Sequence, residues 1–185
     1  MSTAWLVPTS RSIPWQSLAS VGAGMVAVTA LASYADSWPV GLLGLAAAAL
    51  AAAVVAGMHD PAAALLSALP TSAATRAARR LVLLLPAAAL LWAAYVGLGR
   101  VWVTGLGWPV GEVTALVATG LAVFACAPSS YAVVAGVAAP ITWYAAAWAG
   151  GALPDALAEV LFAWQHHPWV VTVVAVAALV LRRNR

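Results

Sequence analysis

The chain has 185 residues, of which 65% are hydrophobic and 7% charged, whereas soluble proteins carry roughly a quarter charged residues. This composition excludes a soluble globular protein and makes a lipid bilayer the expected surroundings. All eight basic residues are Arg, and they lie in short clusters separated by long apolar runs. The net charge of +3 therefore does not indicate nucleic-acid binding, because the basic residues do not form one continuous basic surface.

Long uncharged stretches divide the chain into segments that can cross a bilayer, which takes about 20 apolar residues in a helix. The longest stretch, 113–154, contains the turn-forming residues 126–130, which should return the chain after one crossing. Abundant Ala and Leu without strand-like alternation favour helices over a membrane barrel. The sequence therefore predicts an all-α membrane protein with six transmembrane helices, at 18–35, 40–58, 81–99, 109–127, 131–150 and 168–182.

The positions of the Arg residues predict the orientation, because cytoplasmic loops retain positive charge. With six spans, seven of the eight Arg fall on one side: Arg11 before span one, Arg76, Arg79 and Arg80 between spans two and three, and Arg182, Arg183 and Arg185 after span six. An odd number of spans would put the two main clusters on opposite sides. We therefore expect a multi-pass protein of the cell inner (plasma) membrane with cytoplasmic N- and C-termini.

Two units are predicted along the chain. Residues 1–17 combine Trp5, Leu6, Ile13 and Trp15 with small polar residues and one Arg. This mixture predicts a segment that lies along the cytoplasmic membrane interface, and an irregular N-terminal tail is the alternative. Residues 18–185 then form a single six-helix transmembrane domain.

The cytoplasmic loop between spans two and three predicts a short helix. Asp60 followed by Pro61 is a typical helix start, and Pro70 should end the helix. One face of this helix carries an apolar edge, formed by Leu65, Leu66 and Leu69. Either the membrane surface or a partner protein should cover that edge.

The next helix is predicted to begin before the membrane. Thr71 and Ser72 are residues that favour the N-cap position, so they can start a helix that runs through the Arg cluster into span three.

The outer loop between spans five and six predicts an amphipathic helix. Pro154 and Asp155 begin it, Asp155 and Glu159 mark its polar side, and Pro168 restarts the chain as span six. Its apolar side recurs at helical spacing, with Leu157, Val160, Leu161 and Trp164. This helix should lie in the outer membrane interface.

The topology and the cytoplasmic loop together resemble the permease (transmembrane) subunits of type-2 ABC exporters. Those permeases often have an acidic start after span two, a Leu-Leu pair, a Pro followed by Ser or Thr, and basic residues that lead into span three. The matching positions here are Asp60, Leu65-Leu66, Pro70-Thr71-Ser72, and Arg76, Arg79 and Arg80. The chain departs from the family at His59-Asp60, where a Glu-Arg pair is usual.

The resemblance implies that this loop docks on a separate cytoplasmic ATPase subunit. The implied partner-binding residues are Asp60, Leu65, Leu66, Leu69, Pro70 and Arg76. It also implies a second permease copy or paralogue beside this chain. The chain contains no Lys and therefore no P-loop, so ATP and Mg²⁺ would bind to the partner ATPase, and this chain needs no cofactor of its own.

A substrate path is the other candidate site. Trp143, Tyr144 and Trp148 on span five can line an apolar path, or they can form part of the aromatic belts at the membrane interfaces. Glu112, near the start of span four, is interpreted either as a helix-capping residue or as a group that handles substrate or protons. The spans carry no nucleophile–base pair, so we expect a transport subunit and not an enzyme.

Two other functions remain open from the sequence. One is the six-helix, small-molecule-binding component of a vitamin-type importer, in which an edge of Ala19, Ala23 and Ala27 would meet a scaffold helix. The other is an accessory or assembly subunit of a larger membrane complex. His166 and His167 are expected to anchor the chain at the outer interface, and a metal site there is the weaker alternative.

Overall fold

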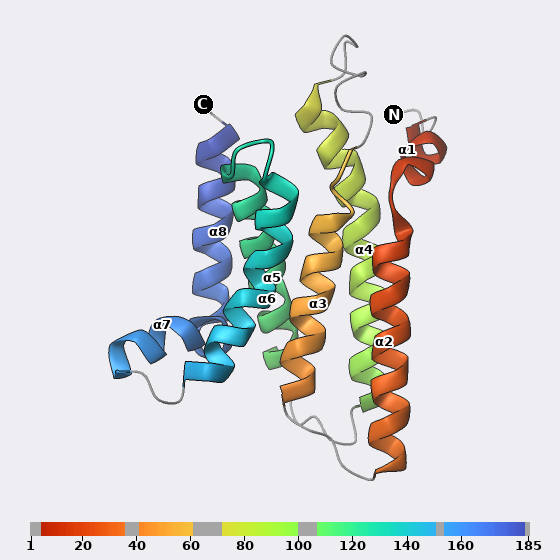
Figure 1. Cartoon of the computed structure of the whole chain (residues 1–185). Coiled ribbons are helices and arrows are strands. Elements are labelled where there is room, and N and C mark those ends of the chain that lie inside the picture. Colours follow the sequence, from red (N-terminus) through yellow and green to blue (C-terminus); the bar gives the residue numbers. More distant parts are fainter. Residues whose placement is uncertain (1–4, 36–40, 61–71, 100–106, 151–153, 184–185) are drawn as a thin grey trace.

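The computed structural model describes residues 5–35, 41–60, 72–99, 107–150 and 154–183. In these ranges the regular structure is helical throughout, with short turns between helices (Figure 1). The helices are α1 (Leu6–Ser12), α2 (Trp15–Tyr34), α3 (Gly41–Ala56), α4 (Ala73–Gly99), α5 (Gly107–Cys126), α6 (Ala132–Ala149), α7 (Asp155–His166) and α8 (Pro168–Arg183).

Several of these helices have the length and apolar composition of membrane spans. Four qualify on their own: α2, α4, α5 and α6. The pair α7 and α8 qualifies as a fifth, broken span that bends by 89°, and α3 is a shorter apolar helix. The chain is therefore an all-α, multi-pass membrane protein with four or five candidate spans among the described residues. A helix lies at each of the six positions where the sequence predicts a span.

Local signals account for most helix ends. The turn predicted at 126–130 lies between the end of α5 and the start of α6. The Ser72 hydroxyl accepts a hydrogen bond from the Thr75 backbone N–H at 3.1 Å, which confirms Ser72 as the N-cap of α4. From there α4 continues as one helix through the Arg cluster to Gly99, as predicted.

Helix α3 is the centre of the bundle. It contacts α2, α4, α5 and α6, and ten of its 16 residues are buried. A helix that is apolar on every side belongs in the interior, where neighbouring helices can surround it. Its Ala and Gly residues let four neighbours approach closely, which is how helices gain packing energy inside a membrane.

The tightest of these contacts joins α3, α5 and α6. Gly120 of α5 faces Gly136 of α6, and Val55 of α3 packs against both. A methyl group on Gly136 would lie 2.9 Å from the Gly120 carbonyl oxygen and 2.8 Å from Val55 Cγ1. The three helices can therefore meet at this level only because both positions lack a side chain.

The two ends of the bundle differ in charge. Helix α1, the first turns of α4 and the last turn of α8 lie at one end, and they carry the Arg residues whose side chains are described: Arg11, Arg76, Arg79, Arg80 and Arg182 (Figure 1). Helix α7 lies across the opposite end and carries Asp155 and Glu159. The seven-residue α1 packs against α4.

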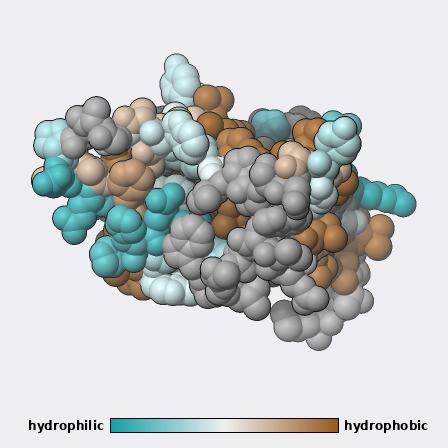
Figure 2. Space-filling view, turned by 90° about the horizontal axis from the view of Figure 1, so that it is seen from below, coloured by the Kyte–Doolittle hydropathy of each residue, from teal (hydrophilic) through white to brown (hydrophobic). Residues whose placement is uncertain are grey.

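The apolar side predicted for α7 is divided in two by its packing. Trp164 is fully buried and Leu161 packs against the core, whereas Leu157 and Val160 are exposed. From this end of the molecule, hydrophilic side chains gather at the left, on the side where α7 lies (Figure 2). Helix α7 thus docks on the bundle by one edge and leaves a second apolar edge uncovered.

Replacing Gly136 with Ala should lower the stability of the protein by about 1–3 kcal/mol, because backbone atoms oppose the new methyl group. Gly24 is the matched control, since a Cβ there meets nothing within 4 Å. Gly24→Ala should be neutral or stabilising by up to about 1 kcal/mol through helix propensity. Thermal unfolding in detergent measures both effects, and equal melting temperatures for the two variants would contradict the close contact.

Candidate functional site

A buried Arg organises the polar groups at the Arg-rich end. Arg80 is only 4% exposed, and its Nη2 lies 3.0 Å from Oδ1 of Asp60. It also donates hydrogen bonds to the carbonyl oxygens of Met58 and His59, and to the Ser12 hydroxyl at 3.3 Å. We call these five residues the Arg80 clamp. The clamp joins the end of α1, the chain that leaves α3, and the second turn of α4.

The local sequence of α4 explains how the clamp forms. Ser72 caps α4, and Arg76 and Arg80 follow in this helix. Because they are four residues apart, they stand one turn apart on the same face. Both reach Asp60, with Arg76 Nε 3.6 Å from Asp60 Oδ2. Arg79 points elsewhere and lies over the Trp5 ring, 5.7 Å from its centroid, in a cation–π contact.

The clamp also satisfies backbone groups that the end of α3 leaves open. The last carbonyls of a helix have no partner within the helix, and a basic side chain is a favourable donor to them and to the turn that follows. Arg80 fills this role at Met58 and His59 while it neutralises Asp60. A buried charge is tolerated only when it is paired and hydrogen-bonded in this way.

The predicted partner-binding residues are only partly described by the structure. Asp60 and Arg76 come together as an ion pair within the chain. The other four, Leu65, Leu66, Leu69 and Pro70, lie outside the described residues. The clamp therefore joins Asp60, the last residue before segment 61–71, to Arg80 in the helix that follows this segment.

Sequence reasoning missed the central role of Arg80. The i, i+4 spacing of Arg76 and Arg80 beyond a capping Ser was a visible signal that both face one way. The contact with Ser12 had no such signal, because it joins residues 68 positions apart.

The opposite end of α3 is closed by aromatic side chains. The Tyr144 ring lies 6.4 Å from Trp148 and 6.2 Å from Trp164 between ring centroids, and its hydroxyl donates to the Gly41 carbonyl oxygen at 2.7 Å. A side chain at Gly44 would overlap Tyr144 and Trp164. Tyr144 thus packs α6 against the first turn of α3.

The four predicted substrate-path residues do not surround one cavity. Tyr144 and Trp148 meet at the end of α3, and Trp148 is 73% exposed. Trp143 lies apart from that pair: its Nε1 donates to the Leu161 carbonyl oxygen at 2.9 Å, which ties α6 to α7, and its ring lines a lateral groove.

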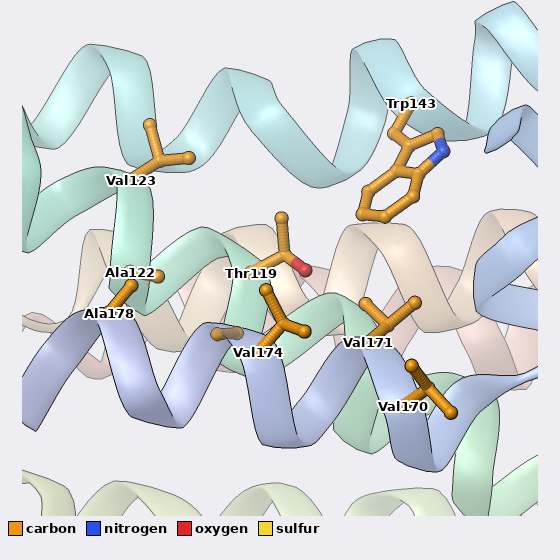
Figure 3. A pocket seen from close by; sticks show the side chains of 9 residues that line it. Thr119, Ala122, Val123, Trp143, Val170, Val171, Val174 and Ala178 are labelled. Atoms are coloured by element: carbon orange, nitrogen blue, oxygen red, sulfur yellow. The ribbon is translucent and has the colours of Figure 1, made fainter.

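That groove runs between α5, α6 and α8 and has a volume of about 330 Å³. Thr119 and Val123 come from α5, Trp143 from α6, and Val171, Val174 and Ala178 from α8 (Figure 3). The lining is apolar apart from the Thr119 hydroxyl and the tryptophan N–H. Its size is at the lower end of the range for small-molecule sites.

Glu112 lies in the interior and is 1% exposed. Helix α5 begins at Gly107, which makes Glu112 its sixth residue and removes it from the first turn. The capping interpretation therefore weakens, because helix-end effects fade beyond the first turn. Its Oε1 is buried without a hydrogen-bond partner among the described residues. Such a group inside a membrane domain favours the functional interpretation.

His166 and His167 are exposed where α7 meets α8, and the His166 ring stacks on Phe162 at 5.9 Å. Within the described ranges, no three His, Cys, Asp or Glu residues group closely enough to hold a metal ion.

Comparison of the chain with protein-family models, with curated proteins and with solved structures finds no match.

Replacing Arg80 with Ala should destabilise the protein by about 3–5 kcal/mol, because it removes one partner of a buried ion pair. Arg79→Ala is the control at the neighbouring position, where loss of a partly exposed cation–π contact should cost about 0.5–1 kcal/mol. Chemical unfolding in detergent micelles compares the two. A double-mutant cycle with Asp60→Ala then isolates the coupling, and additive effects of Arg80→Ala and Asp60→Ala would contradict the clamp.

Proposed function

We propose that this chain is the permease subunit of an ATP-driven, type-2 ABC exporter. A separate cytoplasmic ATPase subunit would bind ATP and Mg²⁺ and supply the energy. The observation that carries the proposal is the Arg80 clamp, because it ties both ends of the proposed docking segment 61–71 to a rigid base.

The clamp supports force transmission. A partner that moves segment 61–71 would act on α3 through Asp60 and on α4 through its first turns, since Arg76 and Arg80 bond to Asp60 across the gap. Because α3 contacts α2, α4, α5 and α6, a displacement of its end would reach most of the bundle. Rigid-body movement of packed helices is a common way to switch a membrane protein between states.

The arrangement of charge supports six spans with both termini in the cytoplasm. The described Arg side chains belong to elements at one end of the bundle, and the acidic α7 lies at the other. The positive-inside rule then places α1, the clamp and the end of α8 in the cytoplasm. In this arrangement α3 and the short α8 each complete a crossing.

The single Cys offers a direct test of this topology. Cys126 is exposed, and it ends α5 on the Arg-rich side. A membrane-impermeant maleimide should label it in inverted vesicles and leave it unlabelled in intact cells. A Glu159→Cys substitution on α7, combined with Cys126→Ala, should give the opposite pattern. Labelling of both positions from the same side would contradict a crossing by α6.

The ATPase contact is tested at the apolar edge of the loop. A Leu65→Asp, Leu66→Asp double variant should lose a P-loop ATPase that co-purifies with the tagged wild-type chain from its native membrane, because the new charges would have to be desolvated. The control is Leu157→Asp with Val160→Asp, two exposed positions on α7 at the other end of the bundle. Mass spectrometry and ATP hydrolysis by the eluate identify the partner.

The outcomes of this test are distinct. Loss of the ATPase from the loop variant alone supports docking at segment 61–71. If the ATPase co-purifies unchanged with the loop variant, the docking site is wrong, and if wild type retains no P-loop protein, the exporter assignment is wrong.

The cargo is proposed to be apolar or amphipathic. Among the described residues, only Arg80 and Glu112 are charged and buried, and neither lies near the middle of a span. A second permease copy or paralogue would complete the path, because the buried helix α3 occupies the centre of the bundle among the described residues.

A binding component of a vitamin-type importer is the second candidate. The 330 Å³ groove favours it, and so does the exposed edge of Ala19, Ala23 and Ala27 on α2, which is free to meet a scaffold helix. Purified protein should then retain one vitamin-sized ligand per chain in a native mass spectrum. An accessory role in a larger complex is the remaining alternative.

A further inference from the structure

We propose that the lateral groove between α5, α6 and α8 binds one acyl chain of an anionic phospholipid, whose phosphate contacts Arg182. The groove is on the outside of the bundle: Val174, which lines it, is 63% exposed. In a chain of this composition the molecules that reach such a face are lipids, and an apolar groove favours their tails.

The shape of α8 supports a lipid over a compact ligand. Val171, Ala175 and Ala178 line the groove, and Arg182 follows at the next helical position, so the four residues form one stripe along α8. The groove therefore leads to a positive charge at the end of the helix.

The length of this stripe matches a lipid tail. From Val171 to Arg182 the helix rises about 17 Å, which is close to the depth of one leaflet, about 15 Å of hydrocarbon. A tail that starts at the level of Arg182 would thus run along the groove and end near Val171, where the Trp143 ring lies.

The charge of the headgroup follows from Arg182. Its side chain is exposed, and it forms no ion pair within the part of the chain that the structure describes. It lies at the same end as the Arg80 clamp, where anionic lipids are attracted by several basic residues. At the membrane surface, the phosphate group of a lipid is the anion available to pair with Arg182.

The experiment measures lipid binding to the detergent-purified full chain by native mass spectrometry. The probes are phosphatidylglycerol and a diacylglycerol with the same acyl chains, so that only the phosphate headgroup differs. Wild type should bind one phosphatidylglycerol, and it should bind this lipid about fivefold more tightly than the diacylglycerol.

A pair of neighbouring valines on α8 tests the groove. Val174→Phe should weaken binding of both lipids by about tenfold, because the larger ring occupies the space of the tail. Val173→Phe is the control, since Val173 is 67% exposed on the same helix but does not line the groove. Both positions are exposed, so both variants should keep the wild-type melting temperature. Equal lipid binding by the two variants would overturn the groove as the site.

The headgroup contact is tested separately. Arg182→Gln should weaken the binding of phosphatidylglycerol by about fivefold and leave the binding of diacylglycerol unchanged. Arg11→Gln removes the same charge from α1 and should leave the binding of both lipids unchanged. Equal effects of the two substitutions would show general attraction to the basic surface and would overturn the assignment of Arg182. The lipid measurement involves no ATPase, so its outcome is independent of the permease assignment.

Discussion

The close packing of α3 is the constraint on which the rest of the structure depends. A bilayer offers no hydrophobic gain for bringing helices together, so association relies on van der Waals contact between well-matched surfaces. Small residues provide that contact on every side of α3, and at Val55 the pairing of Gly120 with Gly136 brings three helices together. The positions of α2, α4, α5 and α6 all follow from this helix, because each of them packs directly against it.

This central position also explains how α3 can be shorter than its neighbours. Its 16 residues span about 24 Å, less than the roughly 30 Å of a hydrocarbon core. Protein groups complete both ends: Arg80 bonds to the carbonyls that follow the helix, and the Tyr144 hydroxyl bonds to the Gly41 carbonyl. Polar backbone at these levels therefore meets protein partners, which is the condition for tolerating it at membrane depth.

The two buried charges give the bundle different ends. Arg80 is ion-paired and hydrogen-bonded, and its contacts hold together the residues on both sides of segment 61–71. Glu112 is buried in the second turn of α5, without a partner for Oε1 among the described residues. A satisfied charge stabilises a fixed geometry, whereas an unsatisfied one marks a place where substrate or protons can act. In the proposed exporter, Arg80 would couple the movement of the ATPase subunit to the bundle, and Glu112 would lie along the substrate path.

The sequence by itself determined the helices, their order and the distribution of charge. The helix positions, the Ser72 cap, the turn at 126–130 and the start of α8 at Pro168 depend on neighbouring residues, so local patterns predict them. Only the tertiary structure decided that Arg80 joins three segments, that Tyr144 packs on Gly41, and that α5, α6 and α8 leave a lateral groove. The Tyr144–Gly41 contact spans 103 positions of the chain. Such partners are set by how small side chains let helices approach, and that depends on all the helices together.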